Sequence, residues 1–200
     1  MHLLQIKDSI NYPHGSSLDE DWVGKNCCKW NRIKCNPSSS RELEALNLKE
    51  NQIGGWVVTQ AFSKMQSLRH INLDYNNLST SIDSLREELL LWGNHLGFYS
   101  RALTVVSRMQ SSKILSLGSN NLSANIDSLE GICKLTALRS LDLAFNGLKD
   151  NGVPQCGGNL SLLEGLYLWR NELIRFIQQL NRFLWIEFYE DSRSWLQQHQ

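Results

Sequence analysis

The sequence predicts an α/β solenoid, a coil of stacked repeats with a short parallel sheet along its concave face. The first observation behind this prediction is the template L-x-x-L-x-L-x-x-N-x-L, which recurs along the chain. The second is the composition, because the 200 residues include 33 leucines and 18 asparagines. The third is the balance of 42% hydrophobic and 20% charged residues, which is typical of a folded chain rather than a disordered one.

Five copies of the template keep a nearly constant phase. Asn51 and Asn76 lie 25 residues apart, and the last three template asparagines are spaced by 26 and 25 residues. The L-x-L core alternates with period two, which indicates a short strand that buries one face. Such a strand cannot bury its leucines alone, so the copies are expected to stack around one core. They occupy residues 43–53, 68–78, 112–122, 138–148 and 163–173.

The repeated asparagine is expected where the chain turns inward after each strand. Backbone groups at such a turn have no partner in the sheet. An asparagine amide offers donor hydrogens and an acceptor oxygen, so it can bond both its own turn and the neighbouring one. An exposed turn asparagine is the alternative, and the fixed phase of the five copies favours the structural role.

Residues 79–111 break the spacing, because Asn76 and Asn120 lie 44 residues apart. A weak copy of the template fits residues 86–96, with Asn94 in the asparagine slot. The same stretch also fits an amphipathic helix, since apolar residues recur every three or four positions from Trp92 to Val106. We favour a distorted repeat followed by a helical or loop insertion.

Residues 174–200 form an atypical tail without a further copy of the template. One interpretation is an amphipathic helix that covers the open end of the stack, with its apolar face formed by Ile174, Ile177, Leu180, Leu184 and Phe188. The alternative is that these residues continue from an altered reading frame or an unspliced intron and have no capping role.

The five cysteines stand at positions 27, 28, 35, 133 and 156. The spacing C-C-x6-C has no C-x2-C pair and no histidine nearby, which argues against a zinc site. Cys133 and Cys156 are 23 residues apart, close to one repeat, so neighbouring coils could carry them. A disulfide between them requires Cα atoms within about 7 Å, and two free buried cysteines are the alternative.

Several function classes are excluded by the same sequence. Twenty basic and 20 acidic residues give a formal net charge of zero, without the basic surplus of a nucleic-acid-binding protein. The chain contains no nucleophile elbow, zinc-protease motif, P-loop or dinucleotide fingerprint, and its five histidines have no ligand spacing. We therefore expect no enzyme, no cofactor and no metal. The chain shows no secretory signal and no apolar stretch long enough to span a membrane.

The repeats resemble the plant-specific class of leucine-rich repeats. That class continues past the asparagine as x-L-S-x-x-I, as this chain does at residues 77–82 and 121–126. Ahead of the repeats, Trp22 and the run Cys27-Cys28-Lys29-Trp30-Asn31-Arg32-Ile33-Lys34-Cys35 resemble the cap that precedes such repeats in plants. The chain up to about residue 173 therefore resembles the start of a plant receptor-like ectodomain.

The resemblance implies a right-handed coil with three parts. These are an amino-terminal cap over residues 1–42, about five or six repeats over 43–173, irregular at 79–111, and the tail over 174–200. The cap would be helical, with a disulfide between Cys28 and Cys35, while Cys27 has no assigned partner. A cap closes the apolar end of a repeat stack. Its expected apolar contacts come from Leu3, Leu4, Ile6, Ile10, Trp22 and Trp30.

Three N-x-[ST] sequons stand at Asn77, Asn121 and Asn159. The first two each follow a template asparagine directly, so they share one outward slot of the repeat, whereas Asn159 lies in a spacer. Repeated outward sequons fit a glycosylated extracellular stack. Chance turn asparagines are the alternative.

The concave face carries the candidate binding residues. Its outward positions alternate with the buried leucines, and aromatic residues and arginine dominate protein-binding hot spots. The second and last copies are the richest in such residues. The candidates are Asn72, Asp74, Tyr75, Asp142, Phe145, Tyr167, Trp169 and Arg170.

The resemblance implies an extracellular ligand-recognition module of a plant leucine-rich-repeat receptor-like protein, in defence or developmental signalling at the plasma membrane. The implied partners are a peptide, protein or cell-wall-derived ligand and a co-receptor. Because such receptors also have a signal peptide, more repeats and a membrane span, we expect this chain to be a truncated ectodomain fragment. The alternative is a secreted inhibitor of cell-wall-degrading enzymes, resembling the polygalacturonase inhibitors, which share this cap and repeat type.

Overall fold

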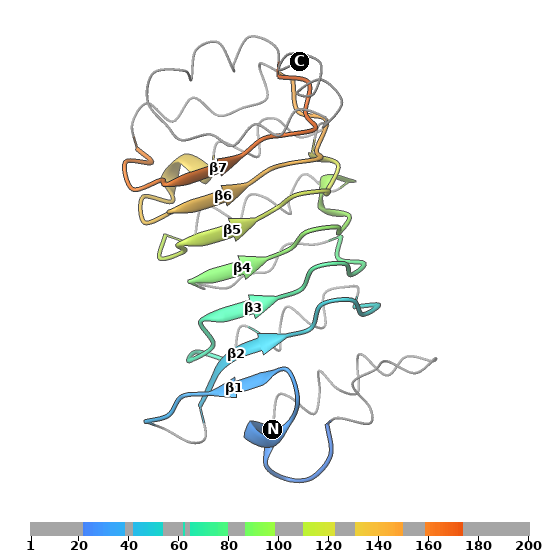
Figure 1. The fold of residues 1–200 in the computed structure, drawn as a ribbon, viewed down its shortest axis with the longest axis vertical. Helices are drawn as coiled ribbons and strands as arrows, with labels where there is room; N and C mark the ends of the chain where they lie inside the picture. The colour runs from blue at the N-terminus through green and yellow to red at the C-terminus, as the bar shows by residue number, and fades with distance from the viewer. Residues whose placement is uncertain are drawn as a thin grey trace, which may run out of the picture.

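Seven short strands form one sheet, stacked in the order of the sequence (Figure 1). The structure, a computed structural model, describes residues 22–38, 42–53, 62, 65–79, 87–98, 110–122, 131–149 and 159–173. The first strand runs antiparallel to the second, and every later pair is parallel. The predicted solenoid is therefore confirmed. Its strands are β1 (Ile33–Cys35), β2 (Leu43–Asn47), β3 (His70–Asn72), β4 (Glu88–Leu90), β5 (Ile114–Ser116), β6 (Ser140–Asp142) and β7 (Gly165–Tyr167).

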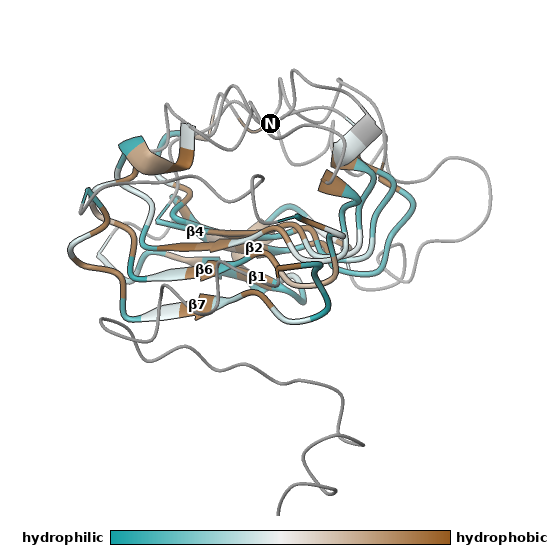
Figure 2. Cartoon of the chain, turned by 90° about the horizontal axis from the view of Figure 1, so that it is seen from above, coloured by the Kyte–Doolittle hydropathy of each residue, from teal (hydrophilic) through white to brown (hydrophobic). Residues whose placement is uncertain are grey.

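Two columns of leucine hold the stack together. The first is set by strand register and contains Leu46, Ile71, Leu89, Leu115, Leu141 and Leu166. The second lies two residues further along each coil and contains Leu48, Leu73, Leu91, Leu117, Leu143 and Leu168. All twelve side chains are at most 7% exposed. Burying one such side chain stabilises the fold by roughly 1.5–3 kcal/mol relative to leaving it exposed. A single copy of the repeat cannot bury its leucines alone, so each coil depends on its neighbours. Figure 2 shows these hydrophobic residues running along the strands.

The template asparagines form the predicted hydrogen-bonded ladder. Asn76 is representative: its Nδ2 donates to the carbonyl of Leu73 in its own turn at 3.0 Å and to that of Leu48 in the preceding coil at 2.9 Å. Its Oδ1 accepts the N–H of Ile53 at 3.0 Å. The other asparagines that bond both their own turn and the preceding coil are Asn94, Asn120, Asn146 and Asn171. The structural role of the amide is confirmed.

The residue before each ladder asparagine has a left-handed backbone. In the six coils these positions have φ between 54° and 65°, at Glu50, Tyr75, Gly93, Ser119, Phe145 and Arg170. Only one of them is glycine, so the turn holds the other five in a conformation that L-residues rarely adopt. This geometry aims their side chains out of the coil. Tyr75 is 51% exposed and Phe145 is 41% exposed.

The weak copy at residues 86–96 is a complete rung of the stack. Strand β4 pairs with β3 and β5, and Asn94 takes its place in the ladder by donating to the carbonyl of Leu73 at 2.9 Å. The interpretation of a helix that begins at Trp92 is therefore wrong for the described residues up to 98, because this copy supplies a strand between two parallel strands. A single 3-10 turn, η2 (Leu96–Phe98), follows. The insertion predicted after it lies at residues outside the described ones.

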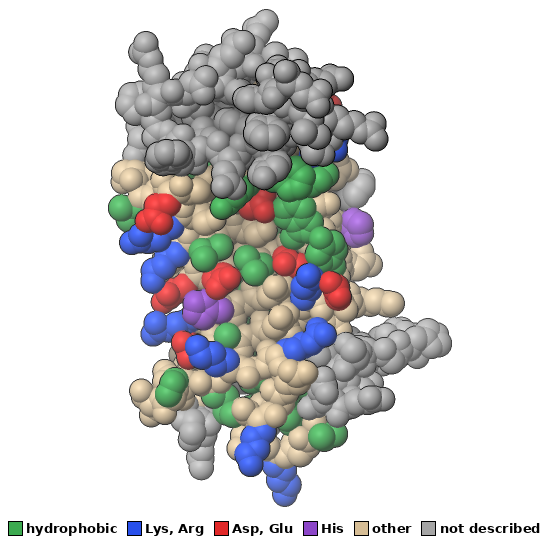
Figure 3. All heavy atoms as spheres, viewed as in Figure 1, with side chains coloured by type: hydrophobic (Ala, Val, Ile, Leu, Met, Phe, Trp, Pro, Cys, Tyr) green, Lys and Arg blue, Asp and Glu red, His purple; other side chains and the backbone are tan. Residues whose placement is uncertain are grey.

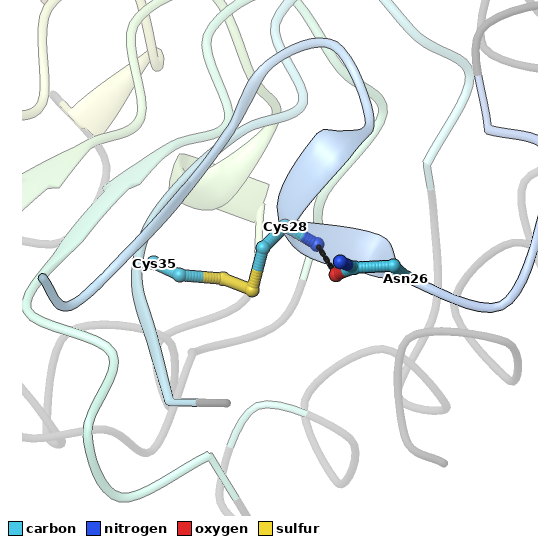
Figure 4. Close-up of a disulfide and its surroundings, with 3 residues drawn as sticks. All are labelled: Asn26, Cys28 and Cys35. Atoms are coloured by element: carbon cyan, nitrogen blue, oxygen red, sulfur yellow. Dashed lines mark hydrogen bonds between the residues drawn. A yellow bond between two sulfur atoms is a disulfide. The ribbon is translucent and has the colours of Figure 1, made fainter. Parts of the chain in front are cut away.

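The described part of the cap has the disulfide that the resemblance implied. Cys28 and Cys35 are joined, with their Cα atoms 5.5 Å apart, and tie the 3-10 turn η1 (Cys27–Lys29) to β1 (Figure 4). The side chain of Asn26 accepts the N–H of Cys28 at 3.2 Å. Cys27 is free. Cys133 is disulfide-bonded, which excludes the free-thiol alternative for that residue, and Cys156 lies outside the described residues.

Two tryptophans anchor the cap to the first coil, as expected. The rings of Trp22 and Trp30 stack with centroids 5.3 Å apart, and both side chains are buried. Each indole N–H has a backbone acceptor, the carbonyls of Asn31 and Val23. The predicted helix face at residues 3–10 and the predicted tail helix lie outside the described residues. Among the described residues, no helix is long and apolar enough to cross a membrane.

Candidate ligand-binding face

Three columns of residues line the concave face, and the backbone hydrogen bonds between coils keep them in register. The middle column follows the first buried leucine of each coil: Asn47, Asn72, Leu90, Ser116, Asp142 and Tyr167. The turn column follows the second: Lys49, Asp74, Trp92, Gly118, Ala144 and Trp169. The tip column contains the residues with left-handed backbone: Glu50, Tyr75, Gly93, Ser119, Phe145 and Arg170.

Three aromatic side chains form a cluster at the carboxyl ends of β4, β6 and β7. The ring centroids of Phe145 and Trp169 are 4.3 Å apart, with an angle of 69° between the ring planes. Trp92 lies 5.7 Å from Phe145 and 6.2 Å from Trp169. Figure 3 shows hydrophobic side chains gathered on this side of the face. We call Trp92, Phe145 and Trp169 the aromatic cluster.

Small residues between the two indoles allow the cluster to form. Trp92 and Trp169 are three coils apart, or about 14 Å at the usual strand spacing of about 4.8 Å. Gly118 and Ala144 occupy the turn column between them, so both indoles can lean over the gap. A Cβ atom on Gly118 would lie 2.1 Å from two ring carbons of Trp92. The indole therefore occupies the space that a side chain at position 118 would fill.

The middle column repeats one turn hydrogen bond with two kinds of residue. The Oδ1 atoms of Asn47 and Asn72 accept the N–H two residues later, at 3.0 and 2.9 Å. Asp142 makes the same bond to the N–H of Ala144 at 2.9 Å. Asparagine and aspartate thus do the same structural work at this slot. The negative charge of Asp142 is an addition that the turn does not require.

Two carboxylates on this face have raised pKa values. Burial raises the pKa of Asp142, and the negative charge of Asp74 raises it further, against hydrogen bonds from Ala144 and Ser116. Burial likewise raises the pKa of Asp74, although the N–H of Trp92 donates to it at 2.7 Å and Lys49 attracts it. Both groups are therefore harder to ionise in the folded protein than in the unfolded chain.

We expect the Asp142→Asn variant to be more stable than the wild type at pH 7. The turn hydrogen bond is kept, while the cost of ionising a half-buried carboxylate near Asp74 is removed. Because the folded-state pKa is raised, the difference should be full above that pKa and should vanish below the usual aspartate value of 3.8. Melting temperatures at pH 7 and pH 3 test this. A variant that melts below the wild type at pH 7 would show that the charge itself supports the fold.

The other half of the face is polar, and several of its charged side chains form ion pairs. A shallow groove of about 360 Å³ lies over β1 to β4. In it, Nδ1 of His70 lies 2.9 Å from a carboxylate oxygen of Glu88, and Lys34 pairs with Glu44. At the amino ends of the strands, Figure 3 shows a column of basic and acidic side chains. Its ion pairs are Arg69–Glu87, Lys113–Glu87 and Arg139–Glu164. Such exposed pairs contribute little stability.

The structure brings some of the predicted site residues together and leaves others apart. Phe145 and Trp169 join the aromatic cluster, with Asp142 on the same two coils. Tyr75 stands apart, where its ring lies against Gly93 and under the Lys49 ammonium, 5.2 Å from the ring centroid. The side chain of Asn72 accepts the turn N–H of Asp74, and the side chain of Asp74 accepts the N–H of Trp92 in the next coil. Tyr167 is half-buried and Arg170 is exposed, both on the last described coil.

Trp92 is the functional candidate that sequence reasoning missed. The helical interpretation of residues 92–106 assigned it to an apolar helix face instead of the turn column. The signal was present, because the weak copy at 86–96 places Trp92 in the same slot as Trp169. The sequon asparagines Asn77, Asn121 and Asn159 are all exposed, as glycosylation requires.

Comparison with known proteins identifies the repeat. The family described as "Leucine rich repeat N-terminal domain" matches residues 2–36, and two leucine-rich-repeat families match residues 67–86 and 134–153. These matches coincide with the cap, β3 and β6. The chain contains leucine-rich repeats. The resemblance seen in the sequence, including the cap, is thereby confirmed.

A curated relative of this chain is a protein from Arabidopsis thaliana described as a "Probably inactive leucine-rich repeat receptor-like protein kinase". The two are 32% identical over 96 residues, which are 47% of this chain and 9% of the relative. The chain thus spans less than a tenth of the length of that protein.

Solved structures share the fold at low sequence identity. Pollen Receptor Kinase 3 superposes with a TM-score of 0.63 at 20% identity, covering 86% of this chain and 82% of the other. A plant ice-binding protein gives 0.56 at 19%, covering 86% and 55%. The BIR2 ectodomain from Arabidopsis thaliana gives 0.51 at 18%, covering 86% and 79%. This leucine-rich-repeat chain therefore has the fold of plant receptor ectodomains.

Proposed function

We propose that this leucine-rich-repeat chain is the ligand-recognition module of a plant receptor-like protein, acting outside the cell in defence or developmental signalling. Its ligand would be a protein or peptide that docks on the concave face. The observation that carries the proposal is the aromatic cluster, in which Phe145 is 41% exposed and packs against two indoles. Clustered, partly exposed aromatics are typical of binding hot spots.

The surroundings of the cluster support recognition rather than catalysis. The side chain of Asp74 accepts the N–H of Trp92 in the next coil, and that of Asp142 accepts the N–H of Ala144 in its own turn and a hydrogen bond from Ser116. The Cys28–Cys35 disulfide and the exposed sequons fit an oxidising compartment. The families that match are repeat scaffolds, which generally provide binding surfaces.

The test uses the purified chain with its disulfides intact and a phage-displayed random peptide library. Selected peptides are synthesised, and their affinities for the wild type and for the Trp169→Ala variant are compared. Removing the indole should weaken binding by about tenfold or more, because truncation of a hot-spot aromatic costs about 2 kcal/mol. The melting temperature should change little, since the indole packs on the surface of the coil.

Leu162 offers a matched control. It is apolar and 49% exposed but lies in the turn ahead of β7, away from the aromatic cluster. The Leu162→Ala variant should keep the wild-type affinity for every selected peptide. If Trp169→Ala also keeps it, or if the two variants lose affinity equally, the concave face is not the recognition surface.

A further inference from the structure

The carboxylate of Asp142 is unusual on the concave face because no cation of the described chain neutralises it. No ion pair in this part of the protein includes Asp142, whereas Glu44, Glu87 and Glu164 pair with lysine or arginine, Glu88 lies beside His70, and Lys49 attracts Asp74. The charged group that acts on the pKa of Asp142 is Asp74, another carboxylate, and it raises that pKa. A half-buried negative charge without a counter-charge is destabilising unless something else supplies one.

The turn geometry does not explain why the residue is an aspartate. Asn47 and Asn72 occupy the same column and make the same hydrogen bond through a neutral amide. A neutral asparagine is therefore sufficient for this turn in two other coils. At position 142, on the coil that also carries Phe145, the residue is an aspartate.

The aromatic cluster lies on the same coils as this charge. Phe145 follows Asp142 by three residues, and Trp169 stands on the adjacent coil in the turn column, next to Ala144. Figure 3 shows acidic side chains at the border of the hydrophobic patch. An indole face attracts a cation through its quadrupole and also packs against the methylene stem that carries it. Charge and aromatic surface together are complementary to a cationic side chain.

We propose that Asp142 and the aromatic cluster bind an arginine or lysine side chain of the peptide ligand. The cationic head contacts the Asp142 carboxylate, and the stem lies on Trp169 and Phe145. This assignment rests on the proposed function and adds the chemical class of the ligand residue at this position. It also disfavours an acidic cell-wall fragment, because Asp74 and Asp142 would repel it.

The experiment is a double-mutant cycle with peptides selected on the wild-type chain. In the peptide, the cationic residue is replaced by its neutral isostere: citrulline replaces arginine, or acetyl-lysine replaces lysine. In the protein, Asp142 is changed to asparagine, which keeps the turn hydrogen bond. The single changes should each weaken binding about tenfold or more, and the second change should add little to the first.

Asn72→Asp serves as the reverse control. It places the same charge in the same column on β3, away from the cluster, and should not rescue Asp142→Asn. The melting temperature of each variant reports whether it folds.

Failure of this inference can be told from failure of the proposed function. Peptides that lose affinity with Trp169→Ala but contain no enriched cation, or bind Asp142→Asn as tightly as the wild type, would overturn the cationic ligand and leave the recognition face standing. Peptides indifferent to Trp169→Ala would overturn both. Binding of oligogalacturonate that weakens with Trp169→Ala, in place of any peptide, would also contradict the cationic ligand.

Discussion

Replacing Asn146 by alanine should lower the free energy of unfolding by about 3 kcal/mol, as expected when several buried polar groups lose their partners together. The side chain is 2% exposed and bonds two coils at once. Its oxygen accepts two N–H groups and its nitrogen donates to three carbonyls. The five partners are Asn120, Leu122, Leu117, Leu143 and Ala144. Chemical denaturation monitored by circular dichroism measures the loss.

Asn51 provides the matched control, because it occupies the same slot at the start of the stack. Among the described residues, its Nδ2 donates only to carbonyls of its own turn, and its Oδ1 has no hydrogen-bond partner. The reason is topological: the strand before β2 is antiparallel, so no preceding coil presents an N–H group there. The Asn51→Ala variant should cost only about 1 kcal/mol. Equal losses for the two variants would show that bonding between coils contributes nothing.

The regular part of this fold could be predicted because one repeated residue pattern dictates both packing and hydrogen bonding. Leucine at every second position places Leu115 and Leu117 in the core, and the amide of Asn120 closes the turn behind them. These requirements are local and recur in every coil. Any copy that meets them, even the weak one around Leu89, is drawn into the same sheet by its neighbours.

The binding face could be predicted only in part, because it depends on contacts between residues in different coils. Phe145 and Trp169 were recognisable as exposed aromatics from their slots alone. Trp92 reaches them because Gly118 and Ala144, which lie between the two indoles in the stack, are small. The pattern within a single repeat does not reveal this contact between coils. The unpaired charge of Asp142 could not be predicted, because it depends on which acidic residues have basic partners in the folded chain.

Substituting Gly97 by alanine is expected to be as damaging as the loss of Asn146, although only a methyl group is added. A Cβ atom at this position would lie 1.8 Å from the carbonyl oxygen of Asn121 and 2.8 Å from that of Asn120. Both atoms belong to the backbone of the next coil, so no side chain can rotate away. The N–H of Gly97 donates to the Asn120 carbonyl at 2.9 Å, which fixes the close approach.

The strain must therefore separate two coils or break that hydrogen bond, and we expect a loss of about 3 kcal/mol in the free energy of unfolding, at the upper end for overpacking. Gly165→Ala is the control, because its added carbon would lie 3.4 Å from the ring of Tyr167, close to an ordinary contact. That variant should change stability by about 0.5 kcal/mol or less. If Gly97→Ala unfolds at the same denaturant concentration as Gly165→Ala, the coils can separate at η2 without loss of stability. The tight stacking of β4 on β5 would then end at the ladder asparagine.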